Sequence, residues 1–214
     1  MGIPYVTDID PRYGTAVEVT PTIRRVVANN PGRFTFTGTG TYIVGRGQVA
    51  VIDPGPEDDE HVASILSAVG GEEITHIVVT HTHRDHSPAS RPLQTATGAP
   101  IYGFGGHPTP PEDAATRAKP TTWDSLLPTE EELEELLKSM PSAGKNDSEH
   151  DQDEPGDMSF APDFEVVHGD TIAGGTWTLE VVHTPGHISN HLCFGYKEER
   201  SLFSGDHVMG WSTS

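Results

Sequence analysis

Short runs of apolar or alternating apolar and polar residues divide this chain into many small elements, with glycine and proline between them. Such runs predict strands, because residues rich in Val, Ile, Phe, Tyr and Thr are bounded by turn-forming residues. The predicted strands cover residues 17–19, 24–27, 34–37, 41–44, 48–53, 74–80, 100–102, 164–167, 171–172, 177–182, 191–196 and 202–203. Hairpins therefore come first, and strand–helix–strand units follow them.

Helices are predicted where apolar residues recur every three or four positions. The first begins at Asp58 or Asp59, whose carboxylate can cap it, and ends at Gly70-Gly71. Two others are expected over residues 90–97 and 129–140. Strands that alternate with helices indicate an α/β fold.

The segment at about residues 108–162 departs from this pattern. Proline interrupts it repeatedly, and 17 acidic against 4 basic residues between Glu112 and Asp170 account for −13 of the net charge of −19. We interpret the segment as an acidic, proline-rich insertion that is solvated and disordered. The chain of 214 residues is then a single domain, residues 1–214, that carries this insertion.

Composition limits the location and the partners of the protein. No apolar run is long enough to cross a membrane, and the first residues do not resemble a signal peptide. A single cysteine excludes an internal disulfide, so a cytoplasmic location is expected. The acidic net charge disfavours non-specific binding to nucleic-acid phosphates.

The candidate chemistry centres on His81-Thr82-His83-Arg84-Asp85-His86, which directly follows the apolar run 74–80. In an extended segment, residues two apart point to the same side, so His81 and His83 can bind one ion together. If the chain then turns into a helix, Asp85 and His86 reach a neighbouring position that suits a second ion. A solvated histidine-rich loop is the alternative reading.

Two later strands end in the same manner. Thr184-Pro185-Gly186-His187 follows the strand 177–182, and Asp206 follows the strand 202–203. With the hexapeptide they supply four histidines and two aspartates, a nitrogen and oxygen set that suits zinc, manganese or iron. Asp206 is the natural bridge, because a carboxylate can share its two oxygens between neighbouring cations.

This combination resembles the metallo-β-lactamase superfamily, whose signature joins His-x-His-x-Asp-His, a later Thr-Pro-Gly-His and an Asp after a small residue. The resemblance covers about residues 17–214, and Gly38–Tyr42 and Val51–Gly55 are further similar phrases. It implies a four-layer α/β-β/α sandwich, with the second half incomplete and the site at the edge of the two sheets. It also implies that the first metal is bound by His81, His83 and His187, the second by Asp85 and His86, and both by Asp206.

The resemblance implies hydrolysis as well. A water between two divalent ions has a pKa lowered from about 16 toward ~7, so a hydroxide becomes available to attack a carbonyl carbon or a phosphorus. Asp85 would orient this nucleophile as the catalytic residue. Asp53, at another strand end, would be an outer partner of a ligand histidine, and a capping or turn carboxylate is its alternative role.

Other residues receive smaller roles. His183 is expected to be at most an outer partner of the site, and His191 is expected to line the pocket. His107 and His207 are candidates for contact with the substrate. Cys193 stands among apolar strand residues and is expected to be inert core.

The chain departs from the family pattern in one respect. Family members usually supply a further histidine to the second metal from beyond the bridging aspartate, and no such residue follows Asp206 here. We therefore expect a C-terminally truncated fragment of a longer enzyme. It would bind two divalent ions, zinc first with iron or manganese as alternatives, and its second site would lack one ligand.

The leading hypothesis is a metal-dependent hydrolase of the glyoxalase II-like and β-lactamase-like branch. Its substrate would be a small-molecule thioester or other activated ester, as in hydroxyacylglutathione hydrolases. A β-lactamase-like endoribonuclease that cleaves RNA phosphodiesters is the alternative within the superfamily. A non-catalytic metal-binding module is the alternative from another class.

Overall fold

The computed structural model describes residues 7–106 and 156–212 of the chain. In chain order its elements are β1 (Val17–Thr20), β2 (Ile23–Val27), β3 (Gly40–Val44), β4 (Gln48–Ile52), α1 (Asp59–Val69), β5 (Glu73–Val78), α2 (Ser90–Thr97), β6 (Ile101–Gly103), β7 (Phe164–Glu165), β8 (Thr171–Ala173), β9 (Thr178–His183), β10 (Leu192–Tyr196), β11 (Ser201–Phe203) and the 3₁₀ turn η3 (Gly205–His207). His107 and the helix predicted over residues 129–140 lie outside the described residues.

The first sheet contains seven of the described strands in sequence order, β1 to β7. Neighbours from β1 to β4 are antiparallel, which fits the glycine-rich hairpin turns of the sequence. The strands from β4 to β7 are parallel. Parallel neighbours need a crossover connection. Helix α1 supplies it between β4 and β5, and α2 supplies it between β5 and β6.

Helix α1 has the ends that the sequence predicted. The Asp58 side chain accepts a hydrogen bond from the Glu60 backbone N–H at 2.9 Å, and Gly70 ends the helix with a φ of 64°. Val62, Ile65 and Val69 lie on the buried face. They pack on one side of the first sheet, where the core also includes Leu93 from α2.

The second sheet contains the described strands β8 to β11 in the order β11-β10-β9-β8, and all neighbours are antiparallel. Its apolar side chains pack against the other side of the first sheet in one common core. Trp177, which is 1% exposed, donates its indole N–H to the Gln48 carbonyl at 2.9 Å. A Cβ at Gly45 would lie 2.3 Å from the Trp177 ring, so glycine is required where the two sheets meet.

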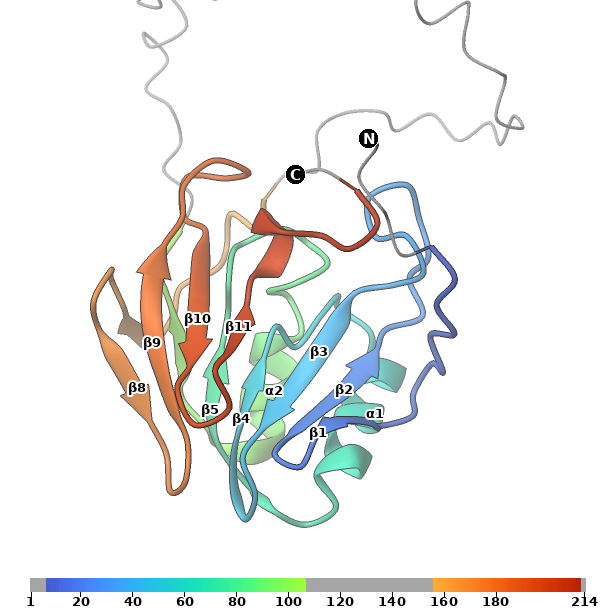
Figure 1. Cartoon of the computed structure of the whole chain (residues 1–214), viewed down its shortest axis with the longest axis horizontal. Helices are drawn as coiled ribbons and strands as arrows, with labels where there is room; N and C mark the ends of the chain where they lie inside the picture. The colour runs from blue at the N-terminus through green and yellow to red at the C-terminus, as the bar shows by residue number, and fades with distance from the viewer. Residues whose placement is uncertain (1–6, 107–155, 213–214) are drawn as a thin grey trace, which may run out of the picture. The chain divides into compact units, whose positions relative to one another are not determined.

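These layers confirm the expected α/β sandwich. Figure 1 shows the orange to red strands β8–β11 together, with α1 and α2 on the far side of the blue to green strands. The described residues therefore form three layers, helices, first sheet and second sheet. Within them, no helix is long and apolar enough to cross a membrane.

The prediction of a strand at residues 34–37 is wrong. This segment forms turns, with one isolated bridge between Gly32 and Phe36. Phe36 has a φ of 54°, and the Gly38 backbone N–H donates to the Thr35 carbonyl at 2.8 Å. A Cβ at Gly38 would lie 2.1 Å from the Ala28 carbonyl oxygen, so the backbone bends where only glycine fits. The phenylalanine side chains line a cavity instead of joining the sheet.

Residues 156–162, which were expected within the acidic insertion, pack onto the first sheet. The Asp157 backbone N–H donates to the Thr82 carbonyl at 2.5 Å. Phe160 is 8% exposed and belongs to the core on the helix side of the sheet. Ordered packing therefore resumes before residue 162.

Candidate metal centre

The hexapeptide lies just beyond β5, at the carboxyl end of a parallel strand, where α/β sheets commonly place ligands. The chain leaves it in a turn rather than in the helix considered from sequence. The His86 and Ser87 backbone N–H groups both donate to the His83 carbonyl, at 3.0 and 3.2 Å. This turn still separates Asp85 and His86 from the first two histidines, because the chain folds back after His83.

The first group of side chains consists of His81, His83 and His187. The His83 Nδ1 atom lies 3.1 Å from His81 Nε2 and 2.9 Å from His187 Nε2. These atoms and an oxygen of Asp206 all lie within 4.8 Å of one another. Residues 104 positions apart in the chain thus converge at one point.

The second group consists of Asp85 and His86. The His86 Nε2 atom lies 3.2 Å from Asp85 Oδ2 and 3.5 Å from Asp206 Oδ1. The other oxygen of Asp206, Oδ2, lies 3.5 Å from His187 Nε2 and 4.0 Å from His81 Nε2. Asp206 therefore stands between the two groups with one oxygen toward each.

Asp53 orients a histidine in each group. Its Oδ2 accepts hydrogen bonds from His86 Nδ1 at 3.0 Å and from the Thr80 hydroxyl at 2.8 Å. Because the Thr80 proton is directed to Asp53, the hydroxyl can only accept from His81 Nδ1, which lies 3.0 Å away. Both rings then carry a proton on Nδ1, and each Nε2 atom faces the centre. Asp53 itself has a φ of 49°, an uncommon backbone conformation for a residue with a side chain.

Burial and mutual repulsion keep the first group uncharged. Burial, with the neighbouring histidines, lowers the pKa of His81 well below its ordinary value and that of His83 to about 4. Burial also lowers the pKa of His187. Neutral imidazoles leave lone pairs available for a cation.

The second group has the opposite electrostatics. Burial alone would lower the pKa of His86, but the carboxylates of Asp85, Asp53 and Asp206 raise it well above the ordinary value. Burial opposes ionisation of Asp85, yet the His86 charge and the hydrogen bonds from His86 and Thr39 hold its pKa well below the usual range. Asp85 is therefore a carboxylate throughout the neutral range.

Two threonines for which the sequence predicted no role hold this arrangement. Thr80 links His81 to Asp53, and the Thr39 hydroxyl donates to Asp85 Oδ2 at 2.6 Å. Thr39 lies in Gly38–Tyr42, one of the segments that resemble the family, and Thr80 lies directly before the hexapeptide. Thr80 directly precedes His81, whereas no local signal links Thr39 to Asp85, which is 46 positions away.

The expectation that His191 lines the pocket is wrong, because this side chain is fully buried. Its Nε2 accepts a hydrogen bond from the Asp206 backbone N–H at 3.2 Å. An amide can only donate, so the ring proton is on Nδ1, which lies 2.9 Å from the Thr184 hydroxyl. His191 thus holds the main chain that carries Asp206.

Three other residues lie outside the two groups. His183 contacts the Ser189 carbonyl at 2.9 Å and stacks on Phe104, so the described residues give it no contact with the two groups. His207 is exposed in η3. Cys193 is buried, and its burial raises the pKa of the thiol, which agrees with an inert core role.

The donor set fits a divalent cation. Three imidazole nitrogens converge within hydrogen-bond distance although neutral rings have only one proton each. A cation accepts all three lone pairs, and neutral histidine nitrogens with carboxylate oxygens are the ligands that zinc and related metals prefer. The cluster could therefore hold a metal ion.

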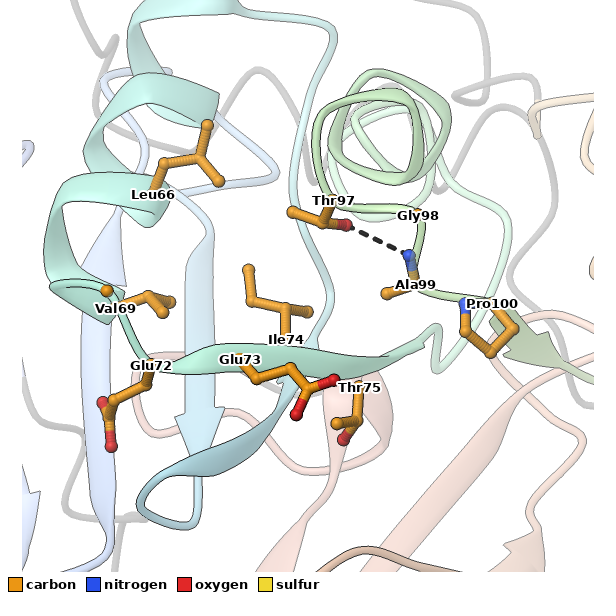
Figure 2. A pocket seen from close by; sticks show the side chains of 11 residues that line it. Leu66, Val69, Glu72, Glu73, Ile74, Thr75, Thr97, Gly98, Ala99 and Pro100 are labelled. Carbon is orange, nitrogen blue, oxygen red and sulfur yellow. Dashed lines mark hydrogen bonds between the residues drawn. The ribbon is translucent and has the colours of Figure 1, made fainter.

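A cavity of about 590 Å³ opens beside the second group, and its lining includes Asp53, Asp85, His86 and Asp206. Another cavity, of about 500 Å³, lies at the opposite end of β5, between α1 and α2 (Figure 2). Its lining contains the glutamates Glu72 and Glu73 but no histidine, and Glu72 is paired with Arg24 at 2.6 Å. The cavity beside the two groups is therefore the candidate substrate site.

Comparison with known proteins gives a family match over most of the chain. Residues 35–213 match the family model described as the metallo-beta-lactamase superfamily. An atrochrysone carboxyl ACP thioesterase of Claviceps purpurea is 29% identical over 213 residues, 97% of this chain and 52% of the relative. A lactamase-like protein of Aspergillus niger is 29% identical over 203 residues, 94% of this chain and 48% of the relative. The chain thus spans about half the length of the curated relatives it matches.

Solved structures agree on the fold. A beta-lactamase domain protein from Burkholderia ambifaria has a TM-score of 0.61 at 18% identity, over 98% of this chain and 62% of that chain. ETHE1 from Myxococcus xanthus has a TM-score of 0.53 at 22% identity, over 87% of this chain and 58% of that chain. At these identities the likeness concerns the arrangement of layers and strands.

Proposed function

Because the chain belongs to the metallo-beta-lactamase superfamily, we propose that it is a metal-dependent hydrolase of thioesters. The observation that carries this proposal is the position of Asp206, with one carboxylate oxygen toward each group of side chains. Relatives of similar sequence that are named ACP thioesterases support a thioester over other activated esters. The narrower hydroxyacylglutathione substrate has no such support.

The two groups are proposed to hold two divalent cations, with zinc as the first choice. His81, His83 and His187 would bind one cation, Asp85 and His86 the other, and Asp206 both. When bound, the cations would lower the pKa of a water and polarise the acyl carbonyl. The second group offers fewer described side chains than the first, so we expect the weaker affinity there.

The chain's own residues would prepare this site for the reaction. Asp53 and Thr80 hold His81 and His86 with their Nε2 atoms inward, so that neither ring has to reorient. Asp85 remains ionised and can accept a proton from an attacking water, which it would orient toward the carbonyl carbon. The Thr39 hydroxyl bond keeps that carboxylate in place.

Reconstitution of the metal-free protein with zinc, manganese or iron tests the proposal. Thioester hydrolysis should depend on the added metal, and Asp85→Asn should lower the rate by about 10²–10⁴-fold. Asp59→Asn, which makes the same charge change on the exposed start of α1, should leave the rate unchanged.

The other hypotheses have separate outcomes in the same experiment. Cleavage of RNA without thioester hydrolysis would favour the endoribonuclease. Retention of metal without hydrolysis of thioesters, RNA or β-lactams would favour a non-catalytic module and would contradict the proposal.

A further inference from the structure

The cavity beside the second group is mainly apolar away from its carboxylates. Its walls come from the turns at 34–40, from β1 to β3 and from residues 201–211. Phe36 stacks on Trp211 with a ring distance of 5.3 Å, and Tyr42 lies 5.3 Å from Phe203. Such walls are typical of a site for an apolar or aromatic ligand.

Exposed apolar surface gathers at this cavity. Four of the large hydrophobic residues that are at least half exposed line it, namely Val19 at 52%, Phe34 at 50%, Leu202 at 57% and Val208 at 64%. Exposed apolar side chains that gather at one cavity mark a binding surface more often than isolated exposed residues do.

Arg25 brings a positive charge into these apolar walls. It is the only lysine or arginine among the described residues that line the cavity. Alternation along β2 places it on the same face as Ile23, which belongs to the core between the sheets, whereas Val26 faces the helices. Its side chain lies against Gly40, next to the Thr39 that donates to Asp85. Arg25 therefore lines the same cavity as Asp85 and His86.

The Arg25 guanidinium has no hydrogen-bond or ion-pair partner within the part of the chain that the structure describes. Its Nε–H is buried and donates to no neighbouring oxygen, and no side-chain hydrogen bond or ion pair involves Arg25 there. The Nε of the adjacent Arg24 is also unpaired, but its Nη1 pairs with Glu72 at 2.6 Å and donates to the Ala68 carbonyl at 3.0 Å.

A partly buried cation without a partner is costly, and a carboxylate is the group that compensates it best. The carboxylates at the end of the cavity do not serve, because Asp53 and Asp85 accept from Thr80, His86 and Thr39. The anion for Arg25 would then come from the ligand. The planar guanidinium matches a carboxylate through two parallel hydrogen bonds.

We propose that Arg25 is a specificity-determining residue that binds a carboxylate on the acyl part of the substrate. The substrate class is an aromatic or otherwise bulky apolar acyl thioester that carries this carboxylate away from the scissile bond. The inference rests on the proposed thioesterase function for the reaction, but not for the binding of the carboxylate.

Two aryl-acyl thioesters of N-acetylcysteamine, one with a carboxylate and one with a carboxamide in its place, provide the test. Arg25→Gln should lower kcat/KM for the carboxylate substrate by about 10–100-fold, the range of a charged hydrogen bond, and should change the carboxamide substrate little. Arg25→Lys keeps the charge without the planar fork and should retain part of the preference. Arg46→Gln, in the exposed turn between β3 and β4, is the matched control.

Direct binding separates this inference from the proposed function. The aryl carboxylate alone, added to the metal-free protein in calorimetry, should bind the parent protein more tightly than Arg25→Gln even if no thioester is hydrolysed. Equal binding by both proteins, or an equal loss on both thioesters with a lower melting temperature, would overturn the role of Arg25.

Discussion

At the scale of single residues, the site depends on the two carboxylate oxygens of Asp206 and on the two carboxylate oxygens of Asp53. The Asp206 carboxylate lies near both groups of side chains. The Asp53 carboxylate orients the His86 ring directly and the His81 ring through Thr80, in both cases at Nδ1. Asp206 should therefore decide whether metal is bound. Asp53 should decide how tightly the metal is bound, because Asp53 acts through the orientation of other side chains.

Replacement of Asp206 is therefore predicted to lower the metal content per chain more than replacement of one histidine. His83→Ala should reduce the metal retained after dialysis mainly at the first group, and Asp206→Ala should reduce it at both. Elemental analysis of the purified proteins measures this stoichiometry. His183→Ala, whose ring contacts Ser189 and Phe104, is the control, and a loss of metal in that variant would contradict the assignment.

Asp53→Asn should weaken metal binding while the fold is kept. Both Asp53 oxygens accept hydrogen bonds, whereas asparagine has only one oxygen, so either His86 Nδ1 or the Thr80 backbone N–H loses its acceptor. Affinity measured by competition with a chelator should fall by about 10–100-fold. The exposed Glu57→Gln makes a similar charge change in the same loop and should have no effect. Unchanged affinity in Asp53→Asn would assign Asp53 to turn formation alone.

At the scale of elements, α1 is tied to the loop that carries Asp53. His61 of α1 is buried, and its Nε2 lies 2.8 Å from the Thr41 hydroxyl, which donates to the Asp53 carbonyl at 2.7 Å. The ring must then donate from Nε2. Gly55 has a φ of 97°, and a Cβ there would lie 2.9 Å from the His61 ring, so helix and loop are packed closely. The Gly55 N–H in turn donates to the His86 carbonyl at 3.0 Å.

This packing predicts a loss of stability in acid. Burial lowers the pKa of His61, against a weaker opposite effect of Asp58. The unfolded chain takes up a proton near its ordinary pKa of about 6.5, before the folded protein does. The stabilisation is therefore present above about pH 6.5 and declines below it, by at most about 1.4 kcal/mol per pH unit for one proton.

Urea unfolding of the metal-free protein at several pH values measures this effect. His61→Gln should show a smaller decline than the parent protein between pH 7 and pH 5. The exposed His207→Gln should show the same decline as the parent. An identical pH dependence in all three proteins would contradict a buried neutral His61.

At the scale of the whole molecule, the two sides of the acidic segment meet at one place in the described fold. The Asn190 side chain donates to the Thr82 hydroxyl at 2.9 Å and to the Gly105 carbonyl at 3.1 Å. The Asp157 backbone N–H donates to the Thr82 carbonyl. Residues 105 and 157 thus contact neighbouring groups, and a long connection between them adds little closure entropy. The single domain with an insertion remains our proposal.

Replacement of residues 108–153 by a short Gly-Ser linker should leave the metal content unchanged and the melting temperature within a few degrees. The physical reason is that Asn190 and Thr82 hold both junctions without the segment. Differential scanning calorimetry and elemental analysis provide the readouts. A large fall in the melting temperature would show that the segment is part of the core and not an insertion.

The sequence by itself determined what depends on neighbours along the chain. Periodicity and capping residues predicted α1 with its ends, and strand-end positions identified the six side chains that the structure brings into two adjoining groups. Their role as ligands remains a prediction. Only the tertiary structure decided that residues 34–37 line a cavity, that Thr39 holds Asp85 across 46 positions, and that His191 holds Asp206 from a buried site. The reason is physical: a side chain's partners across sheets depend on register and packing, which no local pattern encodes. Arg25 is the clearest case, since adjacent arginines on one strand face opposite sides and only one of them is paired in the described fold.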